Sequence, residues 1–211
     1  MRTLLAAAAF AVAATGCVGS LKNTDPEPLT YRLGAPQLQG GDGLAADLAV
    51  ARPEFAPGLG TGRIATRWPG RRFDYYAGAR WAEDLPALVQ SALIESLSGS
   101  HRLHSVQGDL GRFRATHVLA VKLQYFEADY TAGALPTARV ELAATLGRQS
   151  DRRVLASFSV AASQPAAANR LTEVVAALDE AFGRAATEVA TRSFDAIADD
   201  LARQAADGAR R

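Results

Sequence analysis

The 211-residue chain contains only one cysteine and three histidines. A single cysteine cannot form an internal disulfide, so the fold has to be stabilised by its hydrophobic core. The 23 basic and 22 acidic side chains nearly balance, which provides no extended basic field for nucleic acid. The sequence also lacks a Gly-x-Ser-x-Gly elbow and any second cysteine that could complete a metal site. We therefore expect no catalytic residue, no enzymatic activity, no metal and no cofactor.

Long apolar runs are also absent, except near the N-terminus. Arg2 provides a positive start, residues 4–14 are apolar, and small residues follow. This order is typical of a secretory signal peptide, and the run is shorter than the roughly 20 apolar residues that a membrane-spanning helix needs. We expect residues 1–16 to be the signal peptide.

The only cysteine, Cys17, comes directly after that segment. The stretch Ala14-Thr15-Gly16-Cys17 resembles the lipobox of bacterial lipoproteins, with alanine at the position where leucine is usual. The resemblance implies that Cys17 carries a diacylglyceryl group on sulfur and an acyl group on its amine. Val18 at the next position implies sorting to the outer membrane, with the protein on its periplasmic side. The alternative is an ordinary signal peptide that is cut nearby, with an incidental cysteine.

The rest of the chain alternates between strand and helix patterns. Period-two alternation and β-prone residues predict strands at residues 30–33, 48–51, 63–68, 73–77, 103–106, 116–130, 138–148 and 152–162. Apolar residues at helical spacing predict helices over residues 81–97 and 170–205, the second with Asn169 as its N-cap.

This pattern predicts an α+β fold with a mostly antiparallel sheet of about five to six strands and two main helices packed on one face. We expect a lipidated N-terminus and tether at residues 17–29, one domain at residues 30–205, and a frayed tail at residues 206–211.

Two groups of polar or aromatic residues are candidates for a site. His101 and His104 are three residues apart, but lie next to Gly99 and a short strand, where we expect a solvated loop instead of a metal site. Tyr75, Tyr76, Arg80 and Trp81 fall within seven positions, and such residues are enriched at interfaces. Two interpretations of this second cluster stay open: packing between the hairpin and the first helix, or contact with a partner.

Several segments together resemble a known family. They are TYRL (30–33), LAVARP (48–53), GTGRIATR (60–67), FDYYAGARWAEDLPALVQSALIESL (73–97) and THVLAVKLQYFEAD (116–129). The chain resembles the ABC-type transport auxiliary lipoproteins, which include the lipoprotein of the paraquat-inducible system.

The resemblance implies a non-catalytic lipoprotein that accompanies an ABC transporter with MCE-domain proteins. Such systems move phospholipids between the inner and outer membranes. The implied role is to dock the periplasmic assembly at the outer membrane, with possible self-association into a homo-oligomer. The alternatives are a direct lipid-binding carrier and an outer-membrane partner of another envelope machine.

Overall fold

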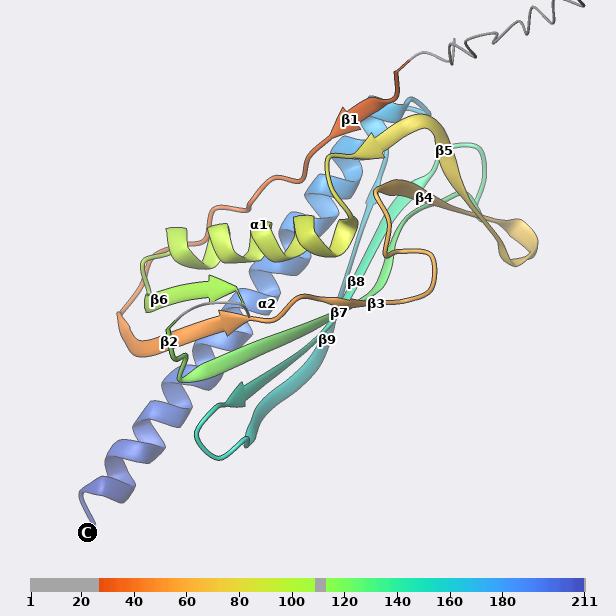
Figure 1. Ribbon diagram of the computed structural model, residues 1–211. Helices are drawn as coiled ribbons and strands as arrows, with labels where there is room; N and C mark the ends of the chain where they lie inside the picture. Colours follow the sequence, from red (N-terminus) through yellow and green to blue (C-terminus); the bar gives the residue numbers. More distant parts are fainter. Residues whose placement is uncertain (1–26, 109–112, 211) are drawn as a thin grey trace, which may run out of the picture.

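The computed structural model describes residues 27–108 and 113–210. Within these ranges the strands are β1 (Leu29–Tyr31), β2 (Leu44–Val50), β3 (Glu54–Phe55), β4 (Arg63–Trp68), β5 (Arg72–Trp81), β6 (Leu103–Gly108), β7 (His117–Asp129), β8 (Thr137–Arg148) and β9 (Val154–Pro165). The helices are α1 (Leu85–Gly99) and α2 (Leu171–Gly208), and η1 (Pro69–Arg71) is a 3-10 turn between β4 and β5. The fold is α+β with two main helices, as predicted (Figure 1).

The long strand β7 organises the sheet. Along one edge it pairs in parallel with β2 at its start, with β3 in its middle and with β4 at its end. Its other edge pairs antiparallel with β8 over nearly its whole length, and β8 in turn pairs antiparallel with β9. Six strands follow one another in the order β1-β5-β4-β7-β2-β6, and β3, β8 and β9 branch from this path.

The sheet is therefore mixed, and the prediction of a mostly antiparallel sheet is wrong. The hairpins β4–β5 and β8–β9 are antiparallel, as their short connections require. The chain between β4 and β7, however, contains β5, α1 and β6. A crossover of this length lets β7 return in parallel beside β2, β3 and β4, and local alternation in the sequence does not show such pairing.

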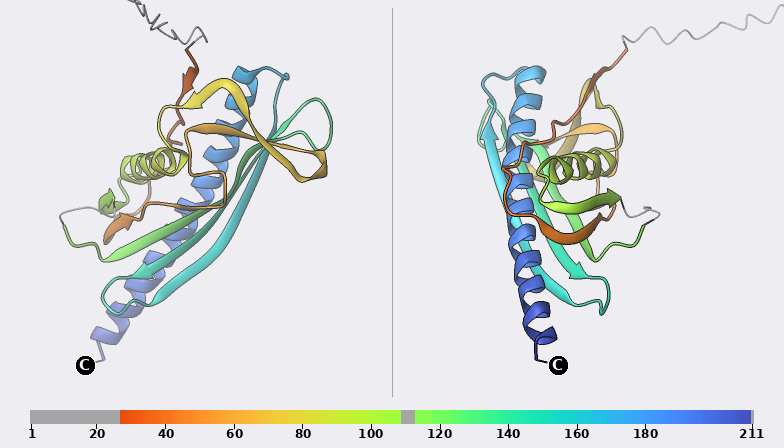
Figure 2. Two further views of the ribbon diagram at one scale, coloured as in Figure 1. Left: turned by 45° about the vertical axis from the view of Figure 1, so that its right-hand side comes forward. Right: turned by 90° about the vertical axis from the view of Figure 1, so that its left-hand side faces the viewer.

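Helix α2 lies along the β8–β9 hairpin, and its C-terminal end projects beyond the turn of that hairpin (Figure 2). Its predicted apolar stripe is buried, and the alternating residues of β8 are buried opposite it. The buried members of these two rows include Leu178, Phe182, Val189, Val140, Leu142 and Leu146. The helix continues to Gly208, past the boundary expected at Ala205.

Helix α1 begins four residues later than predicted. Trp81 is the last residue of β5, and the helix starts at Leu85. The reason is local: the Asp84 side chain accepts a hydrogen bond from the Ala87 amide at 2.9 Å, which makes Asp84 the N-cap. Pro86 then sits in the first turn, where its missing N–H costs no helical hydrogen bond.

Both helices contribute to one hydrophobic core. α1 packs against β2 and β6, whereas α2 packs against β7, β8 and β9 and also reaches β2. The buried apolar side chains of helices and sheet form one contiguous cluster. The surfaces described next lie at the edge of this core.

Candidate functional site

The four residues of the predicted cluster all lie on β5, but in different environments. Trp81 is 2 % exposed and packs edge-to-face against Phe126, with ring centroids 5.9 Å apart. Arg80 is exposed, and Tyr75 and Tyr76 are half-buried. The core interpretation thus describes Trp81, whereas Tyr75, Tyr76 and Arg80 keep part of their surface open to solvent.

Tyr76 connects β5 to the beginning of α2. Its hydroxyl is hydrogen-bonded to the hydroxyl of Tyr130, which donates in turn to Asn169 Oδ1 at 2.7 Å. Burial, together with the hydrogen bond to Tyr130, raises the pKa of Tyr76. The Asn169 side chain thus accepts a hydrogen bond from Tyr130. The N-cap of α2 is Arg170, and the prediction of Asn169 as the N-cap is wrong.

The outward side of the β4–β5 ribbon carries an arginine–aromatic face, made up of Arg63, Phe73, Tyr75 and Arg80. Arg63 and Arg80 are direct register partners on the two antiparallel strands, so both side chains project to the same side. The guanidinium of Arg63 lies 3.9 Å from the centre of the Tyr75 ring, and Phe73 packs edge-to-face against Tyr75 at 5.2 Å. Neither Arg63 nor Arg80 forms an ion pair with any residue that the structure describes.

The loop before β4 holds this face in place. The Tyr75 hydroxyl donates to the carbonyl oxygen of Gly58 at 3.0 Å. Gly58 has φ +91°, and a Cβ at that position would lie 2.7 Å from the ring of Phe73. Only glycine accommodates both the backbone conformation and the close ring.

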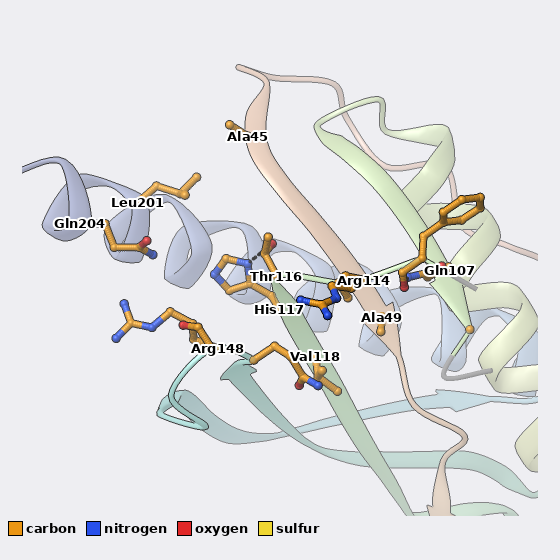
Figure 3. Close-up of a pocket in the computed structure, with 15 residues that line it drawn as sticks. Ala45, Ala49, Gln107, Arg114, Thr116, His117, Val118, Arg148, Leu201 and Gln204 are labelled. Carbon is orange, nitrogen blue, oxygen red and sulfur yellow. Dashed lines mark hydrogen bonds between the residues drawn. The ribbon is translucent and has the colours of Figure 1, made fainter. Parts of the chain in front are cut away.

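A pocket of about 780 Å³ lies elsewhere, between β2, β6, the start of β7, the β8–β9 turn and the last part of α2. Gln107 on β6 lies on one side of it, and Leu201 and Gln204 on α2 lie on the other (Figure 3). Ala49 and Val118 are register partners on β2 and β7, and they line the pocket together. Sequence reasoning missed this pocket because its residues come from five separate segments.

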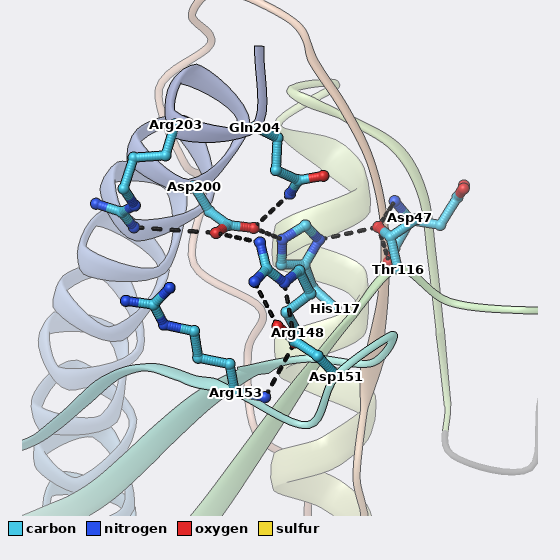
Figure 4. A network of polar contacts seen from close by, with 9 residues as sticks. All are labelled: Asp47, Thr116, His117, Arg148, Asp151, Arg153, Asp200, Arg203 and Gln204. Carbon is cyan, nitrogen blue, oxygen red and sulfur yellow. Dashed lines mark hydrogen bonds and ion pairs between the residues drawn. The ribbon is translucent and has the colours of Figure 1, made fainter. Parts of the chain in front are cut away.

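A polar network around a buried aspartate shares Thr116, His117, Arg148 and Gln204 with the pocket wall (Figure 4). Its centre is Asp200 on α2, which is 1 % exposed. The Asp200 carboxylate accepts hydrogen bonds from Arg148 at 3.0 Å and Gln204 at 2.7 Å, and lies 3.3 Å from His117 Nε2. Thr116 Oγ1 lies 2.9 Å from Nδ1 of the same histidine.

This network superficially resembles a hydroxyl–imidazole–carboxylate triad, but its geometry is that of a structural tie. Thr116 Oγ1 also donates to the carbonyl oxygen of Asp47 at 3.0 Å, which holds the hydroxyl on backbone. His117 is 1 % exposed, so its ring is almost completely shielded from solvent. The network joins the end of α2 to β7 and β8, and it satisfies a carboxylate that would otherwise be buried without partners.

The remaining predicted positions have simple placements. Cys17 lies outside the described residues. His104 is exposed, with Nδ1 3.4 Å from Asp47, and His101 follows the end of α1 with φ +54°. In residues 27–108 and 113–210 no group of three or more His, Cys, Asp or Glu side chains is arranged to hold a metal ion. No helix in the same ranges combines the length and the apolar character that crossing a membrane requires.

Comparison with known proteins decides the family. The family model for the ABC-type transport auxiliary lipoprotein component matches residues 31–190. The chain belongs to this family.

Solved structures share this fold. A Xanthomonas campestris protein of the DUF330 family is 26% identical, with a TM-score of 0.74, over 82% of this chain and 98% of that chain. A hypothetical protein from Chlamydia trachomatis is 12% identical, with a TM-score of 0.51, over 74% of this chain and 98% of that chain, and it shows the fold alone. No curated protein matches the chain.

Membership of this family points to a non-catalytic role and to association with transporter components.

Two features of this lipoprotein could not be predicted from its sequence. One is the pairing of Arg63 with Arg80, which depends on the register of β4 against β5. The other is the Asp200 network, in which the partners are 52 and 83 residues away along the chain. The Asp199–Asp200 pair was visible in the sequence, but nothing there distinguished the buried aspartate from its exposed neighbour.

Proposed function

We propose that this lipoprotein is a non-catalytic auxiliary component of an ABC transporter with MCE-domain partners, which moves phospholipid between the two membranes of the envelope. In this role it is anchored through lipid on Cys17 to the periplasmic side of the outer membrane. There it docks the periplasmic assembly. Family membership supports the association with a transporter, and the arginine–aromatic face supplies a surface for docking.

The observation that carries the docking proposal is the opposition of Arg63 and Arg80. Like charges directly opposite each other on neighbouring strands destabilise a sheet. In the part of the chain that the structure describes, neither arginine has an acidic partner to offset this repulsion. The ring of Tyr75 lies beside Arg63 and Phe73 packs against that ring, and arginine with aromatic residues is the composition of interaction hot spots. A partner surface with exposed carboxylates would relieve the repulsion and form charge-assisted hydrogen bonds.

The test is charge reversal followed by co-purification. The double variant Arg63→Glu, Arg80→Glu is expressed in cells that also produce the MCE-domain protein of the same transporter, and the amount that co-purifies is measured. We expect at least a tenfold reduction in the co-purified amount, because both substituted positions would repel the carboxylates of the partner. The matched control is Arg152→Glu with Arg153→Glu, two exposed arginines at the turn between β8 and β9. Equal co-purification of the two double variants contradicts docking through this face.

A second candidate function is direct carriage of lipid. The pocket of about 780 Å³ favours it, because ligand pockets commonly measure about 300–1,000 Å³. Native mass spectrometry of the protein released from membranes is the direct measurement. A carrier retains a non-covalent lipid, whereas a purely docking protein shows only the mass of the lipidated chain.

A further inference from the structure

The charged side chains that line the pocket between β2, β7 and α2 are basic, as far as the structure describes them. The described residues that line it include two arginines and one histidine, Arg114, Arg148 and His117, but no aspartate or glutamate. Asp151 and Asp200 form ion pairs with Arg148 and neutralise its charge. Arg114 is exposed and forms no ion pair with a residue that the structure describes. Among the described residues, Arg114 is therefore the cation of the pocket wall that has no counter-charge.

Part of the pocket wall is apolar and is formed by small residues. Ala45 and Ala49 on β2 present only methyl groups, and Val118 lies beside Ala49 across the strand pair. Leu201 closes the side formed by α2 (Figure 3). Larger side chains at the two alanines would fill the space. The pocket surface thus continues from the Arg114 guanidinium, which has no acidic partner among the described residues, onto apolar side chains.

We propose that this pocket binds a single acyl chain with an anionic head group. The head group, a carboxylate or a phosphate, pairs with the Arg114 guanidinium, whose planar donors suit both. The chain lies over Ala49 and Val118 toward Leu201, where burial of its methylene groups favours binding. A neutral or cationic amphiphile would leave Arg114 without a partner.

This inference deepens the second candidate function, since it names the ligand class of a lipid-binding protein. It does not depend on docking through the arginine–aromatic face, which is formed by β4 and β5, outside the pocket. Failure of the pocket experiment therefore leaves the docking experiment unaffected, and the reverse is also true.

The experiment is photo-crosslinking of the mature lipoprotein reconstituted in bilayers. Two probes carry a diazirine in the acyl chain: palmitic acid, with a carboxylate, and lysophosphatidylglycerol, with a phosphate. A monoacylglycerol with the same diazirine is the neutral comparison. Labelled peptides are identified and quantified by mass spectrometry, and the two anionic probes distinguish a free fatty acid from a lipid head group.

Three variants accompany the wild type. Arg114→Glu reverses the charge at an exposed position, and Ala45→Phe fills the pocket at another exposed position, so neither disturbs the core. Arg71→Glu is the matched control, because Arg71 lies in η1 at the turn between β4 and β5. Circular dichroism confirms that each variant is folded.

We expect at least one anionic probe to label peptides that contain residues 113–118 or 201–204. Labelling should fall about tenfold in Arg114→Glu, as loss of one charge-assisted hydrogen bond predicts. It should also fall in Ala45→Phe and stay unchanged in Arg71→Glu. Equal labelling by the neutral probe, or unchanged labelling in Arg114→Glu, would overturn the proposal, and so would labels confined to other parts of the chain.

Discussion

At the scale of single residues, neighbouring positions on β5 have opposite roles. Trp81 is buried against Phe126, whereas Arg80 points outward and its Nε donates to Thr30 Oγ1 at 3.4 Å. Replacing a buried tryptophan with alanine leaves a large cavity, so we expect Trp81→Ala to lower the free energy of unfolding by about 3–5 kcal/mol. Arg80→Ala should change it by less than about 0.5 kcal/mol. Urea denaturation followed by fluorescence or circular dichroism measures both, and similar effects of the two variants would contradict this assignment.

Glu127 on β7 has a buried carboxyl group whose desolvation is not fully offset by hydrogen bonds. It is 4 % exposed, and its Oε1 has no hydrogen-bond partner among the described residues. Burial raises the pKa of Glu127, and the nearby charges of Arg67 and Arg139 oppose this effect only in part.

A raised pKa in the folded state fixes the direction of the pH dependence. The contribution of Glu127 to stability is complete below the pKa of an unfolded glutamate, and it is lost as the pH rises through the folded value. Glu127→Gln removes this titration. We therefore expect the free energy of unfolding of the variant, relative to wild type, to increase as the pH rises from 4 to 8. Denaturant titrations across this range provide the measurement, and a difference that is independent of pH would show that Glu127 does not titrate differently on folding.

At the scale of elements, the end of α2 depends on one aspartate. Asp200 receives Arg148 from β8 and Gln204 from its own helix, and it lies next to His117 on β7. Removal of its carboxylate leaves Gln204 and the buried His117 without their shared partner, and Arg148 then pairs with Asp151 alone. We expect Asp200→Ala to lower the free energy of unfolding by about 3 kcal/mol. Hydrogen exchange should show the loss of protection concentrated in the last turns of α2.

The adjacent residue provides the control. Asp199 is exposed and forms no ion pair within the described parts of the chain. Asp199→Ala should therefore have little effect on stability. If both alanine variants unfold at the same denaturant concentration as wild type, the network does not hold the helix end.

The sequence predicts elements better than their connections. The alternation in β8 and the apolar stripe of α2 are strong local signals, and both elements lie where they were expected. The start of α1 was misplaced because Trp81 matched the helical spacing, while Asp84 was not used as a cap. The parallel pairing of β2 and β4 with β7 was missed because pairing partners leave no mark in local periodicity. The pocket depends on that pairing, and the exposed arginine pair depends on the register of β4 against β5, so neither could be predicted from local patterns.

At the scale of the whole molecule, the described chain enters the fold at β1, at the opposite end from the C-terminus of α2 (Figure 1). Between Cys17 and Leu29 the chain spans at most about 3.3–3.6 Å per residue. A lipid on Cys17 would therefore keep the β1–β5 end close to the membrane.

Anchoring through Cys17 predicts the mass of the mature protein. Intact-mass analysis of the protein from cells should show a chain that begins at Cys17 and carries diacylglyceryl and N-acyl groups. Cys17→Ala should move the protein out of the membrane fraction. An unmodified thiol on a freely extractable wild-type protein would refute the anchor and with it the proposed location.

The central position of β7 also affects how the molecule is made. Thr116 and Asp47, which are joined by a hydrogen bond beside the β2–β7 pair, are 69 residues apart in the chain. Contacts of such high order form slowly, since a long loop has to close before they can contribute. While the ribosome is still synthesising the first half, β2 and β3 have no β7 to pair with. The nascent polypeptide therefore cannot complete its sheet, and it remains an unfolded chain until its second half emerges.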